Sequence, residues 1–208
     1  MNNVRLEGLF PTPVLISKRP KPYTNEEYEF VKNISLQRGT PGQTNKISSD
    51  INILDYPEMN DLKKFFIKSV NLFTEQVYLA SDNELDITIS WINVIEPGCE
   101  HLPHKHKNAI LSGCYYFEPT HDVPLTVSSP LENHDNYDFS SRKYMNPFNS
   151  NEWCLPTDGN TLIMFPAWLQ HRVPLNETKK TRYSIAWNAW FKKNRHYGFV
   201  DSKTYVET

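Results

Sequence analysis

The sequence predicts a mainly β protein with flanking helices, because helical and strand patterns occupy separate parts of the chain. Before residue 80, apolar residues recur at the three- and four-residue steps that are typical of helices. From Asp86 onward, short β-branched and aromatic runs alternate with Pro, Gly, Asp and Asn, which indicates strands and turns. Helices followed by a series of strands favour an antiparallel β core that is backed by helices.

The chain length favours one domain. With 208 residues, of which 38% are hydrophobic, the chain can bury one good core, and a second independent core would be cramped. We therefore expect a single domain over residues 1–208, with helical support in residues 24–80 and a β core in residues 86–191.

Two helices are expected before the strands. Thr24 and Glu27 have capping-box spacing, which predicts a first helix that runs toward Ile34. A second helix is expected after Asp55, with Pro57 in its first turn. One face of this helix should be buried, and it consists of Met59, Leu62, Phe65, Phe66, Val70, Phe73 and Val77.

The predicted strands begin with "DITISWINVI" and continue with "AILSGCYYFEP", "PLTVSSP", "NTLIMFPAWLQ" and "RYSIAWNAWF". The earlier segment "LFPTPVLI" is apolar, but Pro11 and Pro13 restrict it to an edge strand or an extended arm. Residues 128–158 are polar yet contain several aromatic residues, and we expect a long loop there that acts as a lid or binding loop.

Charge and composition exclude several classes of partner. A formal net charge of -2 does not predict binding to nucleic acid or to anionic membranes, which requires a concentrated basic surface. No apolar run approaches the ~18 residues of a membrane span. The three cysteines Cys99, Cys114 and Cys154 have no C-x-x-C spacing, which favours free thiols in a reducing compartment and thus a cytoplasmic protein.

The segment "HLPHKHKN" contains a candidate metal-binding pair. His104 and His106 are two residues apart, so both side chains point to the same side if the chain is extended there. His171 follows another predicted strand, and metal sites on β scaffolds draw their ligands from the ends of several strands. By itself an H-x-H pair beside lysines is more often an ordinary solvated pair, so the spacing alone is a weak signal.

Arg182 adds a second signal. It begins the strand "RYSIAWNAWF" eleven residues after His171, with Ser184 on the same face and apolar residues around it. A buried arginine is rare without an anionic partner, and its planar fork of donors matches a carboxylate. Without the histidines, an exposed arginine or a structural ion pair would be an equal alternative.

The succession of "HKH", "ILSGCYYFEP", "FPAWLQHRV" and "TRYSIAWNAWF" resembles the Fe(II)/2-oxoglutarate-dependent oxygenases, and it is similar to their prolyl-hydroxylase-like branch. The opening "LFPTPV" and the "WIN" at residues 91–93 further resemble a group of these oxygenases from bacteria and phages. The resemblance is good over residues 91–191 and patchy before residue 80. It implies a double-stranded β-helix, which is a jelly-roll or cupin-like fold.

The resemblance also implies a set of site residues. His104 and His171 would be iron ligands, and Arg182 would bind the far carboxylate of 2-oxoglutarate. Tyr116 would donate its hydroxyl to the same carboxylate, Ser184 would complete an R-x-S pattern, and Asn93 is a weaker co-substrate contact. The cofactors implied are Fe(II), 2-oxoglutarate as co-substrate, and O2.

One position departs from the usual His-x-Asp motif of this family, because His106 occupies the place of the carboxylate. Either His106 binds the metal directly, or a carboxylate such as Glu118 or Asp122 reaches the metal while His106 lies behind it. We favour direct ligation, because the spacing from His104 reproduces the motif. His101 is expected to be a loop residue outside the site.

The implied activity is hydroxylation of a small-molecule or peptidyl substrate, with a peptidyl or amino-acid side chain favoured. Two alternatives remain open at this point. A three-histidine cupin-type dioxygenase would not use 2-oxoglutarate, and Arg182 with Ser184 argues against it. A non-catalytic β-barrel binding module would carry the histidines on its surface. The sequence does not indicate an oligomeric state.

Overall fold

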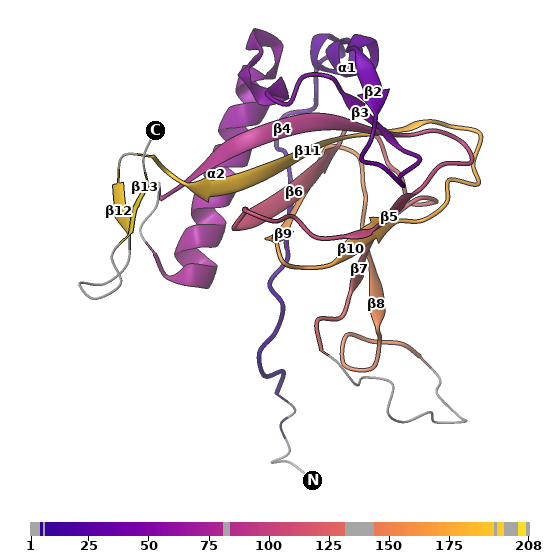
Figure 1. Ribbon diagram of the computed structural model, residues 1–208. Helices are drawn as coiled ribbons and strands as arrows, with labels where there is room; N and C mark the ends of the chain where they lie inside the picture. Colours follow the sequence, from indigo (N-terminus) through magenta and orange to yellow (C-terminus); the bar gives the residue numbers. More distant parts are fainter. Residues whose placement is uncertain are drawn as a thin grey trace.

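The computed structural model describes residues 5, 7–80, 84–131, 144–193, 195–197 and 204–206. It contains two facing antiparallel sheets with two helices on the outside of the larger one (Figure 1). The larger sheet consists, in spatial order, of β1 (Leu15–Lys18), β9 (Thr161–Pro166), β6 (Leu111–Tyr116), β11 (Arg182–Phe191), β4 (Leu85–Ile95), β3 (Lys46–Ser48) and β2 (Leu36–Arg38). The smaller sheet consists of β5 (His101–His104), β10 (His171–Val173), β7 (Leu125–Ser128) and β8 (Glu152–Leu155). A separate hairpin pairs β12 (Arg195–Tyr197) with β13 (Thr204–Val206).

Strand β9 of the larger sheet is buried on both faces, and its side chains alternate between two cores. On β9, Leu162 and Met164 belong to the core beneath the helices, whereas Ile163 and Phe165 belong to the core between the two sheets. A strand that is buried on both sides consists mainly of apolar residues, and all six residues of β9 are buried, of which only Thr161 is polar.

Strands β6 and β11 approach each other closely where Gly113 of β6 lies opposite Trp187 of β11. A Cβ at Gly113 would come within 2.6 Å of the Trp187 ring, which is fully buried. Glycine therefore makes room for this ring against β6.

The helices cover the outer face of the larger sheet, as Figure 1 shows for α2 beside β4. α1 (Asn25–Asn33) begins with the predicted capping box of Thr24 and Glu27. The 3-10 turns η1 (Ile53–Asp55) and η2 (Pro57–Met59) precede α2 (Asn60–Tyr78). Within the described residues, no helix has both the length and the apolar character that a membrane span requires.

The mainly β architecture with flanking helices is confirmed, and so is the edge position of β1. Several boundaries were wrong. Pro57 lies in a 3-10 turn before α2, and Val77 is 38% exposed, so it lies outside the buried stripe. β2 and β3 add two strands to the larger sheet within the expected helical support. The predicted loop 128–158 contains β8, while its residues 132–143 lie outside the described residues.

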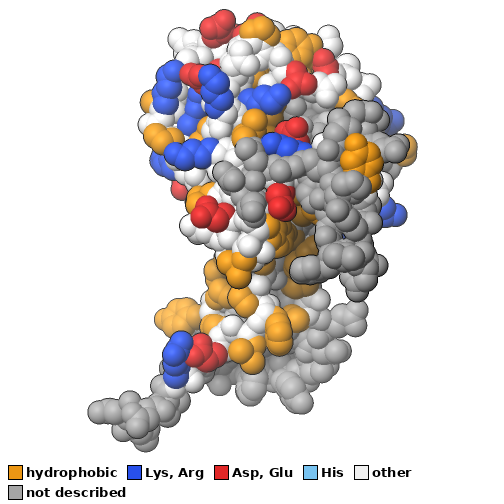
Figure 2. All heavy atoms as spheres, turned by 90° about the vertical axis from the view of Figure 1, so that its left-hand side faces the viewer, with side chains coloured by type: hydrophobic (Ala, Val, Ile, Leu, Met, Phe, Trp, Pro, Cys, Tyr) orange, Lys and Arg blue, Asp and Glu red, His pale blue; other side chains and the backbone are white. Residues whose placement is uncertain are grey.

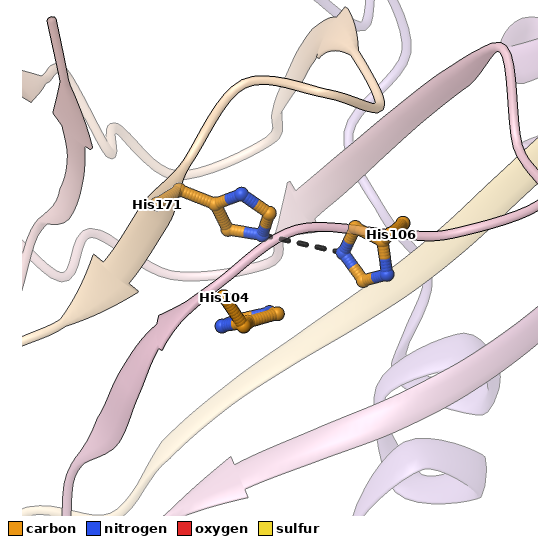
Figure 3. Close-up of side chains that lie close together, drawn as sticks. All are labelled: His104, His106 and His171. Atoms are coloured by element: carbon orange, nitrogen blue, oxygen red, sulfur yellow. Dashed lines mark hydrogen bonds between the residues drawn. The ribbon is translucent and has the colours of Figure 1, made fainter. Parts of the chain in front are cut away.

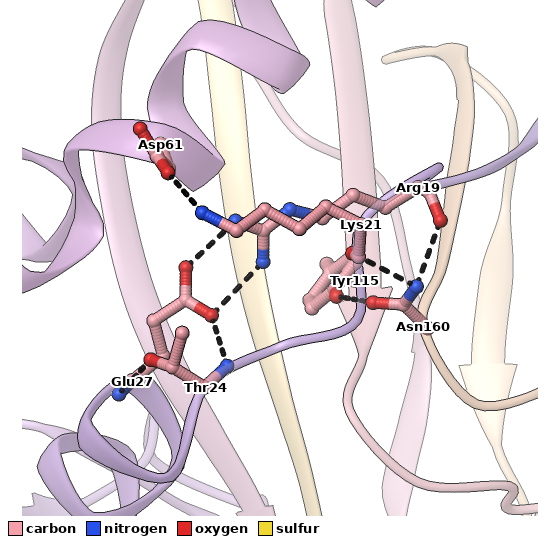
Figure 4. Close-up of polar contacts among 7 residues, drawn as sticks. All are labelled: Arg19, Lys21, Thr24, Glu27, Asp61, Tyr115 and Asn160. Carbon is pink, nitrogen blue, oxygen red and sulfur yellow. Dashed lines mark hydrogen bonds and ion pairs between the residues drawn. The ribbon is translucent and has the colours of Figure 1, made fainter.

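A buried ion pair fixes α1 to the end of β1 (Figure 4). Arg19 donates to both carboxylate oxygens of Glu27 at 2.9 and 2.8 Å, and both side chains are 3% exposed. The same carboxylate accepts the backbone N–H of Thr24 at 2.7 Å, so Glu27 serves the capping box and the ion pair together. Asn160, which precedes β9, donates to the Arg19 carbonyl at 2.8 Å. The pair thereby links the first helix to the edge of the large sheet.

We expect Glu27→Gln to lower the free energy of unfolding by about 3–5 kcal/mol, because the Arg19 guanidinium would stay buried without its anion. Urea denaturation monitored by far-UV circular dichroism would measure this loss. Glu26→Gln is the matched control, since Glu26 is exposed in the same helical turn and its loss should cost no more than about 1 kcal/mol. Equal losses in the two variants would contradict a stabilising role for the buried pair.

Candidate metal centre

Three histidines converge at one end of the smaller sheet (Figure 3). His104 ends β5, His171 begins β10, and the antiparallel register places the two residues directly opposite each other. His106 lies in the loop after β5, where its backbone N–H donates to the Ala167 carbonyl at 3.1 Å. One ring nitrogen from each histidine lies within 4.8 Å of the others. The structure therefore brings together the three residues that the sequence analysis selected.

Backbone carbonyls orient two of these rings. The Nδ1 atom of His104 lies 2.8 Å from the Leu102 carbonyl, and that of His171 lies 2.9 Å from the Leu169 carbonyl. Because a carbonyl only accepts, each Nδ1 carries the proton and each Nε2 keeps its lone pair. The Nε2 atoms of His106 and His171 face each other at 3.2 Å. Lone pairs that converge from rings held by carbonyls are typical of histidine metal sites.

Burial keeps the three imidazoles neutral at pH 7, the protonation state that binds metals. Burial, with a smaller effect from His104, lowers the pKa of His106 to about 4. Burial also lowers the pKa of His104, and it lowers that of His171 well below its ordinary value. Phe165 stands 4.7 Å from the His171 ring and Trp91 stands 5.8 Å from the His106 ring, measured between centroids.

His101 was expected to be a loop residue, and this prediction was wrong. It begins β5 and stacks on His104, with ring centroids 4.0 Å apart and planes inclined by 22°. Burial, followed by the charges of its neighbours, lowers its pKa to about 3. Its Nδ1 atom lies 3.5 Å from the amide nitrogen of Asn93, and the Asn93 oxygen accepts from Asn45 at 2.7 Å. Asn45 carried no signal in the sequence, because it lies 48 residues before its partner.

Arg182 is 4% exposed and makes only neutral contacts. Its Nε donates to the Val123 carbonyl at 3.0 Å, and its Nη2 donates to the Tyr116 hydroxyl at 2.9 Å. Its Nη1 lies 3.4 Å from the Ser184 hydroxyl. Among the described residues, no carboxylate lies within ion-pair distance of this guanidinium. A buried cation is therefore left without an anion from this part of the chain.

Arg182 and the three histidines line one small cavity of about 20 Å³, which is room for roughly one water molecule. Asn93 and His101 also line it, and the remaining walls are Trp91, Cys114, Leu125, Val173 and Ala186. Sequence reasoning had not assigned these last five residues to the site. Cys114 could have been predicted from the sequence, because it lies two residues before Tyr116 and therefore on the same face of β6.

The two carboxylates considered as alternative ligands lie elsewhere. Glu118 and Asp122 are both exposed, and Glu118 accepts a hydrogen bond from the Tyr28 hydroxyl at 2.5 Å. Within the described residues, the set of side chains placed to hold one ion consists of His104, His106 and His171. This geometry favours His106 over a carboxylate as the third ligand.

Residues 89–188 match the model of a protein family described as "Putative 2OG-Fe(II) oxygenase". No curated protein matches the chain. Among solved structures, a prolyl-4-hydroxylase from Pseudomonas putida is 12% identical with a TM-score of 0.59, and the match covers 88% of this chain and 94% of that one.

Two further structures are similar to this chain. The HygX protein of Streptomyces hygroscopicus, solved with nickel and 2-oxoglutarate bound, is 9% identical with a TM-score of 0.59, over 86% of this chain and 82% of that one. A non-heme alpha ketoglutarate-dependent epimerase from nogalamycin biosynthesis is 13% identical with a TM-score of 0.58, over 83% of this chain and 71% of that one. At such identities the likeness concerns the fold, and the predicted double-stranded β-helix is confirmed.

Lowering the pH from about 7 to about 5 should destabilise the metal-free protein. An unfolded histidine titrates near ~6.5, whereas burial lowers the pKa of His106 to about 4 in the folded chain. Between these two pKa values the unfolded chain binds more protons, so the free energy of unfolding falls as the pH falls. Urea denaturation at both pH values, with a chelator present, would measure the difference.

The variant His106→Gln lacks one of the buried imidazoles. The free energy of unfolding of this variant should therefore depend less on pH between about 7 and about 5. His121→Gln is the control, because the His121 side chain is 59% exposed, and this variant should follow the wild type. An unchanged pH dependence in His106→Gln would contradict the explanation from burial.

Proposed function

We propose that His104, His106 and His171 hold an iron ion and that Arg182 binds 2-oxoglutarate, because residues 89–188 match the model of the 2OG-Fe(II) oxygenases. The proposed reaction uses O2 and 2-oxoglutarate to hydroxylate a substrate C–H bond. One observation carries the proposal: a buried guanidinium, with no carboxylate partner in the described chain, opens on the same cavity as three convergent imidazoles.

The three imidazoles fit a divalent transition metal. Nitrogen ligands of this kind suit iron, as well as nickel, copper and zinc. The hydrogen bonds of His104 and His171 to backbone carbonyls leave each Nε2 free to coordinate. His106 Nε2 faces the lone pair of His171 Nε2 and therefore carries its proton there in the metal-free state, so this proton would have to shift to Nδ1 before Nε2 could coordinate a metal. When bound, iron would supply the coupling of 2-oxoglutarate decarboxylation to substrate oxidation.

The polar groups around Arg182 fit a dicarboxylate. The planar guanidinium can grip one carboxylate at two points, and the Tyr116 hydroxyl that it contacts can donate to the same group. The Ser184 hydroxyl accepts from Nη1 of the guanidinium at 3.4 Å and completes the R-x-S pattern. Asn93 lines the same cavity as His101 and lies directly opposite Ser184 in the register of β4 and β11, and we assign it a weaker co-substrate contact.

The cavity has to widen before 2-oxoglutarate can bind, because about 20 Å³ cannot hold a five-carbon acid. His101 is the side chain best placed to move. It is half-buried and is held by one ring stack and by one long hydrogen bond of 3.5 Å. We infer that its ring swings aside when the co-substrate binds.

The alternatives from the sequence have less support. A three-histidine dioxygenase that does not use 2-oxoglutarate would have no need for the buried Arg182, Tyr116 and Ser184. A non-catalytic module with surface histidines does not fit the burial of His171, which is 3% exposed. We further propose a small-molecule or peptidyl substrate, no nucleic-acid or membrane partner, and a cytoplasmic location, the last because all three cysteines are free thiols.

Removing the charge of Arg182 should weaken 2-oxoglutarate binding while the fold and the metal remain. Loss of one partner of a buried charged pair costs about 2–5 kcal/mol, or roughly thirty-fold to several thousand-fold in affinity. Calorimetry on metal-loaded protein without oxygen would compare Arg182→Ala and Arg182→Lys with wild type. Arg182→Lys should also bind 2-oxoglutarate more weakly, because lysine keeps the positive charge but cannot donate two parallel hydrogen bonds to a carboxylate. Arg38→Ala, at an exposed site on β2, is the control. Wild-type affinity in Arg182→Ala would overturn the assignment.

Replacing any one of His104, His106 or His171 by Ala should abolish stoichiometric metal binding, because each removes one of three protein ligands. Elemental analysis of protein dialysed against Fe(II) without oxygen would show about one metal per wild-type chain and a small fraction of that in each variant. The exposed His121→Ala is the matched control and should keep its metal. If His106→Ala retained full metal content, a different group would have to be the third ligand.

A further inference from the structure

We propose that an apolar cleft between the N-terminal arm (residues 7–14) and strands β7 and β8 binds the primary substrate through an uncharged, apolar group. This inference rests on the proposed function, because it names the substrate class for the same metal centre. The cleft has a volume of about 450 Å³, and sites for small ligands commonly measure about 300–1,000 Å³. The lining residues that carry the argument are Phe10, Val127, Leu131, Phe148, Trp153 and Leu169.

The cleft adjoins the metal centre on the side away from Arg182. Val127 lines the cleft and lies directly opposite His171 in the register of β7 and β10. Leu169, another lining residue, provides the carbonyl that orients the His171 ring. Leu125, two residues before Val127 on the same face of β7, lines the cavity of Arg182. One face of β7 therefore runs from the co-substrate cavity, past His171, to the cleft.

Aromatic side chains are exposed around this cleft. Trp153 lies opposite Val127 in the register and is 39% exposed, and Phe148 is 61% exposed. The Phe148 ring also lies against the arm, 3.4 Å from the position that a Cβ on Gly8 would occupy. Phe10 has a φ of 56°, a left-handed backbone that is uncommon for an aromatic residue. Figure 2 shows hydrophobic side chains gathered in the lower part of the molecule, near the N-terminal arm. Such a patch usually marks a binding site.

The charges at the cleft are already paired. Its lining includes two charged residues, Glu7 and Glu152. Arg172 donates to both oxygens of the Glu152 carboxylate at 2.9 and 2.7 Å, and Arg5 pairs with Glu7. A charged substrate group would lose its hydration in the cleft without gaining a free counter-charge from the described lining. The cleft thus favours an aliphatic or aromatic group, whether it belongs to a peptide or to a small molecule.

The reaction at this group is balanced by the co-substrates of the proposed function. A substrate C–H bond breaks and a C–OH bond forms, with one oxygen atom from O2 in the product. The second oxygen atom enters succinate, while 2-oxoglutarate supplies two electrons and loses CO2.

The test compares Trp153→Glu with Trp190→Glu. Both tryptophans lie on strands and are 39% and 37% exposed, but Trp190 is on β11 and does not line the cleft. The first measurement is the equilibrium binding of Nile red, an uncharged apolar dye, to the full chain without metal. We expect binding to wild type and to Trp190→Glu, and affinity at least about ten-fold weaker in Trp153→Glu. Absence of binding to wild type, or equal binding by the two variants, would overturn the proposal.

The second measurement is succinate formation from 2-oxoglutarate with Fe(II), first alone and then with the N-acetyl amides of leucine, phenylalanine, glutamine, lysine and glutamate. We expect the leucine and phenylalanine amides to accelerate succinate formation in wild type and Trp190→Glu, and not in Trp153→Glu. Acceleration by the charged amides, or by none of the five, would overturn the substrate class. Loss of all succinate formation together with intact dye binding would instead refute the proposed function and leave the cleft as a binding site.

Discussion

The buried guanidinium of Arg182 is the constraint on which the site depends. A cation inside an apolar barrel has lost its hydration, and a backbone carbonyl with two hydroxyls replaces only part of it. The surrounding fold has to hold those three partners in place, and each comes from a different part of the sequence. Tyr116 belongs to β6, Ser184 to β11, and Val123 to the turn before β7. Under the function proposed above, a carboxylate of the co-substrate would supply the negative charge that the guanidinium lacks, and this would account for the burial of a residue whose desolvation is costly.

The histidine cluster depends on a different kind of restraint, namely strand register and backbone carbonyls. Pairing of β5 with β10 sets His104 opposite His171, and the carbonyls of Leu102 and Leu169 select the nitrogen that each ring presents. With His106 in place of an acid, the proposed ligand set consists of three neutral imidazoles, and none of these three residues would bring negative charge to a bound dication. Under the function proposed above, the carboxylate of 2-oxoglutarate that does not contact Arg182 would bring negative charge to the metal. By linkage, metal and 2-oxoglutarate should raise each other's affinity by the same factor.

Sequence reasoning predicted the features that have a local or periodic signal. The capping box at Thr24 and the apolar stripe of α2 are of this kind, and so is the pair His104 and His106, whose spacing is local. Sequence reasoning failed for short strands, which contain too few residues to show an alternation of apolar and polar side chains. β2 and β3 have three residues each, and His101 lies in a four-residue strand that contains Pro103. Pro103 is tolerated because β5 is an edge strand, a fact that only the sheet order reveals. Asn45 and the wall of the Arg182 cavity are products of tertiary packing, which no local pattern encodes.

The position of β11 has a consequence for how the protein is made. It is the last strand of the two-sheet body in the sequence, yet it lies at the centre of the large sheet between β4 and β6. β1, near the start of the chain, pairs with β9, so Leu15 is opposite Met164. A topology that is dominated by such distant pairings folds slowly. The chain loses the entropy of closing long loops before the stabilising contacts between the strands can form. During synthesis the centre of the sheet stays open until residue 191 has left the ribosome. A chain that ends before β11 would therefore lack Arg182 and Ser184 and would leave the edges of β4 and β6 unpaired, and unpaired strand edges promote aggregation.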